Sequence, residues 1–416
     1  MSFNSLGLSD ALLKAISKKG YTTPTTIQEK AIPRILEKKD VLASAQTGTG
    51  KTAGFALPII QILAQGQRLR KRPVRALVLT PTRELAAQVY AEIKEYCSFV
   101  DIRSTVIFGG VNQNPQVAAL RQGVDILVAT PGRLLDLHGQ KLLSLAKIEF
   151  LVLDEADRML DMGFLRDIRR ILELMPDKRQ NLLFSATFSK EIKRLANGFL
   201  NHPVIVEDTP EQTTVEKINQ KVYRVDKGRK TRLIIKLISE GDWKQVLVFT
   251  RTKHGANRLS QKLVKAGISA SAIHGNKSQN HRTKTLDGFK KATIRVLVAT
   301  DIAARGLDIP LLPHVVNYEL PNVSEDYVHR IGRTGRAGAS GEAISLVSGE
   351  ELAYLKGIEK LIEQSIPSEV VAGFEPSQGT ETEIEEPRKS HFRKPKPKSN
   401  KGNYKKRQRK FGKRTE

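Results

Sequence analysis

The tetrapeptide Leu-Val-Ala-Thr occurs twice in this chain, at 127–130 and at 297–300. A close variant stands fifty residues before each copy, Leu-Val-Leu-Thr at 77–80 and Leu-Val-Phe-Thr at 247–250. Each run is short, apolar and bounded by polar or turn-forming residues, which is typical of strands buried on both faces of a parallel sheet. The same pair of predicted strands is therefore written twice in one polypeptide.

Helical patterns follow these strands. The stretch 83–96 places Leu85, Val89 and Ile93 about one helical turn apart, and 254–267 follows the second-half strand in the same way. The further apolar runs 41–45, 150–154 and 181–187 also alternate with helical stretches. Strand–helix alternation predicts an α/β fold with right-handed crossovers, and its repetition predicts two such domains. We expect domain one over 1–206, a polar linker over 207–215, domain two over 216–368 and a tail over 369–416.

Size and composition agree with two intracellular domains. The chain has 416 residues, and this length exceeds what one ordinary core accommodates. Its hydrophobic content of 39% is enough to form buried cores. No run of about 18 apolar residues suggests a membrane span, and the first residues lack the pattern of a secretory signal. The single cysteine, Cys97, excludes an intramolecular disulfide framework and favours a reducing compartment. We therefore expect a cytoplasmic protein.

The charge is strongly positive and unevenly distributed. The formal net charge is +25, and residues 388–416 carry 14 Lys/Arg against one Glu. This last stretch has no helical or strand period and is expected to be disordered. Its aromatic residues Phe392, Tyr404 and Phe411 could stack on bases while the cations neutralise phosphates. Nucleic-acid binding is the favoured interpretation, and a tail that only improves solubility is the alternative.

A nucleotide site is predicted just after the first strand. The phosphate-loop pattern G-x-x-x-x-G-K-[ST] is matched at Gly50, Lys51 and Thr52, whereas Ala45 replaces the first glycine. Backbone amides of such a loop face a polyphosphate at a helix N-terminus. Lys51 would reach the β and γ phosphates, and the Thr52 hydroxyl would ligate Mg²⁺. The residues expected to line this loop are Ala45, Gln46, Thr47, Gly48, Thr49, Gly50, Lys51 and Thr52.

Two acids follow the apolar run 150–153. Asp154 is placed to hold the metal through its water shell, and Glu155 to orient and deprotonate the attacking water. The alternative is that these acids cap the helix that follows, but Asp157 is available for that capping role. The pair is therefore interpreted as catalytic.

Several further motifs of the chain resemble those of one known family. Asp-Glu-Ala-Asp at 154–157, with AQTGTGKT (45–52), PTRELAAQ (81–88), TPGR (130–133) and SAT (185–187), is similar to the DEAD-box RNA helicases of superfamily 2. ATDIAARGLDIP (299–310) and HRIGRTGRAG (329–338) agree in the second half. FGGVNQNP (108–115) and the short core with a basic tail most resemble the bacterial RhlE type. The resemblance implies two tandem RecA-like domains and ATP-dependent, local unwinding of RNA, with ribosomal precursors or RNA-degradation machinery as partners.

The resemblance also implies roles around the nucleotide. Gln28 would read adenine and Tyr21 would stack on it, supported by Thr23 and Phe3. Gly306 and Asp308 would lie against the ribose. Arg333 and Arg336, which with Arg330 recur at steps of three, would reach the γ-phosphate from domain two, where an arginine can accelerate phosphoryl transfer by roughly 10³–10⁵. Ser185, Thr187 and His329 would couple hydrolysis to domain closure.

RNA contacts are implied at the ends of other strands. The family places sugar–phosphate on Pro81, Arg83, Gly109, Gly110, Thr130, Gly132, Arg133, Arg251, Gln279, Arg282 and Thr300. Arginines, hydroxyls and exposed backbone amides position phosphates without reading bases, so binding is expected to be largely independent of RNA sequence. Two alternatives remain. A DNA-translocating helicase would be favoured if DNA stimulated the ATPase activity as strongly as RNA does. An RNA chaperone would be favoured if removal of the tail abolished strand remodelling but spared ATPase activity.

Overall fold

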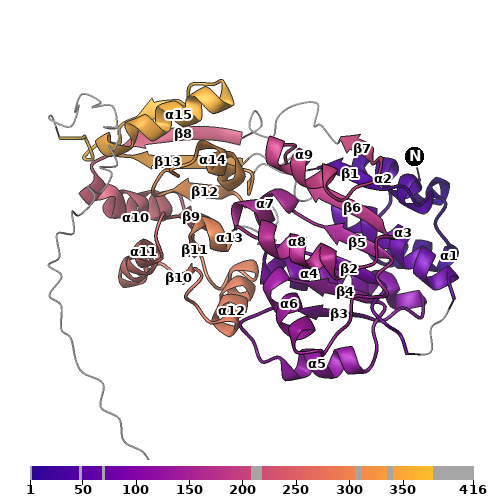
Figure 1. The fold of residues 1–416 in the computed structure, drawn as a ribbon. Helices are drawn as coiled ribbons and strands as arrows, with labels where there is room; N and C mark the ends of the chain where they lie inside the picture. The colour runs from indigo at the N-terminus through magenta and orange to yellow at the C-terminus, as the bar shows by residue number, and fades with distance from the viewer. Residues whose placement is uncertain are drawn as a thin grey trace, which may run out of the picture.

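The protein is described here by a computed structural model. It describes residues 2–45, 49–67, 71–207, 218–304, 309, 312–334 and 341–377. Figure 1 shows two α/β units side by side, the first in indigo to magenta and the second in pink to yellow. Every pairing between the described strands is parallel. The predicted class, a duplicated parallel α/β fold with flanking helices, is confirmed.

The first sheet has the strand order β3-β4-β2-β5-β6-β1-β7. Its strands are β1 (Val41–Ser44), β2 (Ala76–Leu79), β3 (Ser104–Ile107), β4 (Ile126–Ala129), β5 (Phe150–Leu153), β6 (Gln180–Ser185) and β7 (Val204–Glu207). The helices are α1 (Asp10–Lys18), α2 (Thr26–Leu36), α3 (Lys51–Gln65), α4 (Arg83–Tyr96), α5 (Asn114–Arg121), α6 (Pro131–Gly139), α7 (Ala156–Asp161), α8 (Leu165–Glu173) and α9 (Lys190–Asn197), with short 3₁₀ turns η1 (Phe3–Leu6) and η2 (Cys97–Phe99).

The second sheet has the corresponding order β10-β11-β9-β12-β13-β8-β14. Its strands are β8 (Ile218–Arg224), β9 (Val246–Phe249), β10 (Ala270–Ile273), β11 (Val296–Ala299), β12 (His314–Asn317), β13 (Gly341–Val347) and β14 (Ser368–Glu369). The helices are α10 (Lys230–Glu240), α11 (Lys253–Lys265), α12 (Gln279–Lys290), α13 (Asp301–Ala304), α14 (Ser324–Ile331) and α15 (Leu352–Ile362), with 3₁₀ turns η4 (Lys227–Arg229) and η5 (Gly349–Glu351).

The repeated tetrapeptides are neighbouring strands in both sheets. Leu77 of β2 pairs with Leu127 of β4, and Leu247 of β9 pairs with Leu297 of β11. Alternate side chains of each strand enter different cores: Val78 packs with α2, α3 and α4, while Leu77 packs with α6, α8 and α9. Burial on both faces explains why these strands are continuous apolar runs and not alternating ones.

The sheets fall on either side of the predicted linker. The first ends with β7 at Glu207, and the second begins with β8 at Ile218. The second unit extends beyond residue 368, because β14 includes Glu369 and the Ser377 hydroxyl donates to Asp226 at 2.7 Å. Residues 208–217 and the basic tail from 378 lie outside the described residues, so the linker and the predicted disorder of the tail stay predictions.

Candidate ATP and RNA site

The N-terminal end of α2 contacts the end of the phosphate loop. Gln28 is buried, and its Nε2 donates to the Gly50 carbonyl at 3.1 Å while its Oε1 accepts from the Thr25 amide at 3.0 Å. The Thr25 hydroxyl donates to the Thr49 carbonyl at 2.7 Å. Gly50 is the N-cap residue immediately before α3 and has φ of +83°, a left-handed conformation that favours glycine. The predicted adenine-reading residue is therefore joined directly to the phosphate loop.

Other predicted nucleotide contacts differ in exposure. Tyr21 is 37% exposed, with the Lys19 ammonium 5.8 Å from the centroid of its ring, and Thr23 is also exposed. Phe3 is 5% exposed and packs in the core beneath α1 and α2. The Phe3 side chain therefore belongs to the hydrophobic core and is not exposed for stacking on a base. Ala45 is buried, and its amide donates to the Ser185 carbonyl at 3.0 Å.

Lys51 and Asp154 face the predicted phosphate site with unsatisfied polar atoms. Among the described residues, Lys51 Nζ and Asp154 Oδ1 are buried and have no hydrogen-bond partner. Burial raises the pKa of Asp154 to about 7, although the Lys51 ammonium opposes this change. A buried cation and carboxyl without partners are costly unless a ligand completes them. A phosphate oxygen on Lys51 and a metal-bound water on Asp154 would do so.

Glu155 occupies a constrained position. Its backbone is left-handed, with φ of 53°, and it stands immediately before α7. Its Oε2 accepts from Arg158 Nη1 at 2.8 Å, and both side chains are buried. Burial raises the pKa of Glu155, but Arg158, Lys51 and Arg333 outweigh it and hold the pKa below its usual value. The carboxylate is therefore ionised, as a base that accepts a proton must be.

Asp157 connects the acidic motif to the Ser-Ala-Thr segment. Its Oδ2 accepts from the Ala186 amide at 3.0 Å, and its Oδ1 accepts from the Arg158 amide at 2.9 Å. The prediction that Asp157 caps this helix is wrong in position, because Asp157 lies inside α7 and the residue at the N-cap is Glu155, which makes no side-chain capping bond. Asp157 instead bonds an amide in the first turn and the amide that follows β6. The Ser185 hydroxyl in turn donates to the Thr187 carbonyl at 2.8 Å.

The arginines of domain two have separate roles. Arg330 is a structural ion pair: its Nη2 donates to Asp301 at 2.8 Å, its Nη1 donates to Asn317 at 3.1 Å, and its guanidinium lies over Phe249. Arg333 is 5% exposed and acts electrostatically on Glu155 of the other domain. His329 and Arg333 line one small cavity on α14. Gln46, Thr47, Gly48, Gly306, Asp308 and Arg336 lie outside the described residues.

The predicted RNA residues meet across the two domains. Arg83 Nη1 and Gln279 Oε1 are 3.4 Å apart, at the first turns of α4 and α12. Glu84 accepts from Gln279 at 2.8 Å and forms an ion pair with Arg282 at 2.9 Å. Glu84 was not predicted, because an acid in the first turn of a helix is already explained by the helix dipole. Only the approach of α12 reveals its second role.

The remaining predicted RNA residues have various surroundings. Gly110 lies so close to Arg83 that an added Cβ would overlap the guanidinium. Arg133 donates to Gln116 and to the Val111 carbonyl, each at 3.3 Å. The last group of residues stands at strand ends or helix starts: Pro81, Gly109, Thr130, Gly132, Arg251 and Thr300.

Comparison with known proteins identifies the chain. Family models for the DEAD/DEAH box helicase match residues 25–195, and for the helicase conserved C-terminal domain residues 229–338. The ATP-dependent RNA helicase CshA of Limosilactobacillus reuteri is 45% identical over 87% of this chain and 72% of its own length. The chain belongs to the DEAD-box ATP-dependent RNA helicases. It is therefore an ATP-binding, RNA-binding helicase with ATPase activity.

Further relatives support the same family. The ATP-dependent rRNA helicase RRP3 of Saccharomyces cerevisiae is 44% identical over 89% of this chain and 74% of its own. The solved structure of S. cerevisiae Dbp5 bound to RNA and ADP BeF3 matches with a TM-score of 0.78 and 34% identity, covering 89% of this chain and 95% of that one. Within the described residues, no helix is long and apolar enough to cross a bilayer.

Proposed function

We propose that the chain uses both domains as one ATPase site and couples hydrolysis to local, non-processive separation of RNA strands. The observation that carries this proposal is the direct contact between the domains, in which Glu84 pairs with Arg282 at 2.9 Å and accepts from Gln279 at 2.8 Å. In this arrangement Arg333 of domain two helps to lower the pKa of Glu155 in domain one. A charge supplied across a cleft stabilises the γ-phosphate only while the domains are closed. Closure and hydrolysis are therefore linked, and Arg336 is proposed to share this role.

In the proposed chemistry Glu155 orients a water and accepts its proton. Its ionised state and its hydrogen bond with Arg158 keep the carboxylate in one orientation. Lys51 binds phosphate oxygens. Thr52 and Asp154 are proposed to hold Mg²⁺, which would neutralise phosphate charge when bound. The described residues contain no cluster of three or more His, Cys, Asp or Glu, which suits a magnesium ion held mostly by phosphates and waters.

RNA is proposed to bind across the domain junction. Arg83, Arg133, Arg251 and Gln279 supply donors to sugar–phosphate, together with the strand-end residues described above. Because ATP and RNA would both favour the closed arrangement, each must increase the affinity for the other by the same factor. A grip on a bent strand is incompatible with an A-form duplex, so the partner strand would be released locally.

The test is Glu155→Gln, which keeps the side-chain volume and removes the base. We expect ATP and RNA to bind with nearly unchanged affinity while ATP turnover falls by at least 10². Full ATPase activity in this variant would refute the assignment of the base. Stimulation of wild-type ATPase by RNA but not by DNA of the same sequence checks the choice of nucleic acid.

A narrower assignment is also proposed. The segment 108–115 and the basic tail support the bacterial RhlE type, and RRP3, described as an rRNA helicase, supports work on ribosomal precursors. RNA turnover is the other candidate pathway. Since both pathways place ATP and RNA inside the cell, we propose a cytoplasmic location. Crosslinking in cells, followed by sequencing of the bound RNA, separates the two pathways.

A further inference from the structure

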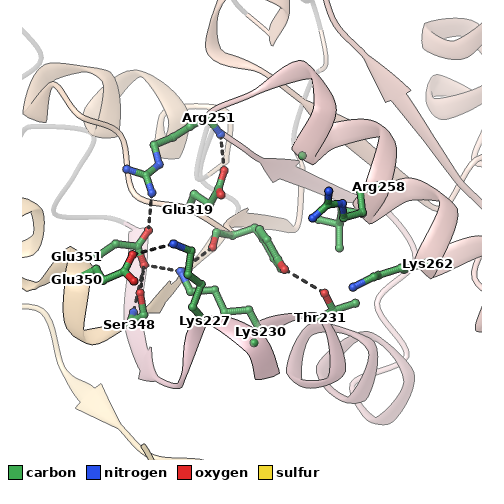
Figure 2. A pocket seen from close by; sticks show the side chains of 14 residues that line it. Lys227, Lys230, Thr231, Arg251, Arg258, Lys262, Glu319, Ser348, Glu350 and Glu351 are labelled. Atoms are coloured by element: carbon green, nitrogen blue, oxygen red, sulfur yellow. Dashed lines mark hydrogen bonds and ion pairs between the residues drawn. The ribbon is translucent and has the colours of Figure 1, made fainter. Parts of the chain in front are cut away.

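A cavity of about 300 Å³ lies at the carboxyl edge of the second sheet. Its walls come from the start of α10, from α11 as far as Lys262, and from the segments after β9, β12 and β13 (Figure 2). Cationic and anionic side chains line it together, including Lys227, Arg258, Lys262 and Glu350. The proposed ATPase mechanism uses none of these four residues.

This cavity occupies the position that the nucleotide site has in domain one. The two strand orders correspond, so β8 takes the place of β1 and β12 the place of β5. The helix after β1 begins with Lys51-Thr52, and the helix after β8 begins with Lys230-Thr231. Glu319 follows β12 as Glu155 follows β5. The duplication thus extends to the phosphate-binding edge.

At this edge of the second sheet, the positive charge of Lys230 is neutralised by a carboxylate of the protein itself. Lys230 forms a buried ion pair with Glu351 and donates to the Tyr318 carbonyl at 3.0 Å. Glu351 also accepts from the amides of Ser348 and Leu320, both at 3.1 Å. A lysine held in this way is unavailable for a nucleotide phosphate. Domain two therefore does not bind ATP through Lys230.

Two of the cations that line the cavity are not paired with any of its carboxylates. Lys227 pairs with Glu350 at 2.8 Å, and Glu319 accepts from the Arg251 amide at 2.7 Å. Arg258 and Lys262 stand one turn apart on α11 and are exposed. Within the described part of the chain, neither has an ion pair with a carboxylate. Figure 2 shows them together on the wall opposite Glu350 and Glu351.

The order of the strands places this wall next to the RNA residues. Gln279, Thr300 and Arg251 follow β10, β11 and β9, and β12 is the next strand along the edge. Neighbouring strands are about 4.8 Å apart, so the cavity begins within one or two strand widths of Arg251, which itself lines it. Arg251 donates to Asn322 at 3.2 Å and lies over the Tyr354 ring.

We propose that an RNA strand extending past Arg251 places phosphate groups in this cavity, against Arg258 and Lys262. This inference rests on the proposed binding of RNA across the domain junction and lengthens its path. The cavity is the second-domain counterpart of the phosphate loop, changed from a nucleotide site into a sequence-independent contact for the RNA backbone. Phosphate contacts of this kind add affinity without reading bases.

The test compares full-length wild type with Arg258→Gln/Lys262→Gln. The control, Lys265→Gln/Lys291→Gln, removes the same charge from exposed positions of domain two outside the cavity. Affinities are measured by fluorescence anisotropy, with a non-hydrolysable ATP analogue, for oligouridines of about 6 and about 12 nucleotides. The basic tail is present in every protein, so its contribution cancels.

We expect the cavity variant to bind the short RNA as wild type does and the long RNA about five- to tenfold more weakly. Two lost phosphate contacts should also reduce the slope of log affinity against log salt by about 1.4 for the long RNA. The control should match wild type at both lengths.

An equal loss at both lengths, or a loss no larger than in the control, would overturn the inference. So would binding of tripolyphosphate that is abolished in the cavity variant without any effect of RNA length, because the cavity would then serve a small anion. Absence of RNA-stimulated ATPase in wild type would instead refute the proposed function, and it is measured first.

Discussion

Asp154 shows how one buried carboxyl makes stability depend on pH. Burial raises its pKa from 3.8 to about 7 in the folded protein without nucleotide. Between these values the folded state holds a proton that the unfolded state releases. The free energy of unfolding therefore falls as the pH rises from about 4 to about 7, in contrast to an ordinary salt-bridged acid.

Asp154→Asn should remove this cost of ionisation. At about pH 8 we expect the variant to be more stable than wild type by on the order of 2–4 kcal/mol, with the difference vanishing near pH 4. Chemical unfolding in EDTA across this pH range checks it. Parallel pH profiles for the two proteins would show that folding does not raise the pKa of Asp154.

Gly50 is the glycine that the nucleotide site most requires. Its φ is +83°, and an added Cβ would overlap Nε2 of Gln28. Gly50→Ala should cost about 1–2 kcal/mol in backbone strain and separate Gln28 from the loop. We expect at least a tenfold loss of ATP affinity by calorimetry. Gly54→Ala, in the same helix with only ordinary contacts near 4.0 Å, is the control and should bind ATP normally.

At the scale of elements, the pair Lys230–Glu351 joins α10 to η5. Both side chains are 2% exposed, so removing one partner leaves a charge buried alone. Glu351→Ala should destabilise domain two by about 3–5 kcal/mol, whereas Lys230→Met/Glu351→Leu should recover most of that loss. Trp243, the only tryptophan, is buried in the same domain and reports this unfolding by fluorescence. Failure of the double variant to recover would mean that the ion pair itself supplies net stability.

At the scale of the whole molecule, Glu84 couples the domains. It accepts from Gln279 and pairs with Arg282, and the Glu84 and Arg282 side chains are 9% and 11% exposed. Glu84→Gln should reduce the factor by which RNA increases the apparent ATP affinity, on the order of tenfold, and spare ATP binding without RNA. Glu95→Gln, also on α4 but exposed, is the control. Equal coupling in both variants would remove Glu84 from domain closure.

Much of the fold was predictable because it is written locally. The repeated apolar runs predicted neighbouring strands, and their pairing Leu77 with Leu127 and Leu247 with Leu297 is in register. The loop before α3 and the acids after β5 follow directly on buried strands, where parallel sheets place ligands. The step of three that relates Arg330, Arg333 and Arg336, however, gave Arg330 no role, and only packing shows that it forms a buried ion pair with Asp301.

By itself the sequence determined which chemistry is present: a phosphate loop and an acidic pair in the first domain, and arginines but no phosphate loop in the second. These depend on neighbours along the chain, whose spacing covalent geometry sets. The tertiary structure alone decided three contacts. Gln28 donates a hydrogen bond to the Gly50 carbonyl, Glu84 forms an ion pair with Arg282, and Glu351 forms an ion pair with Lys230. The last two contacts join residues more than a hundred positions apart. They arise from the order of strands in the sheets and the approach of two domains, which no local pattern encodes.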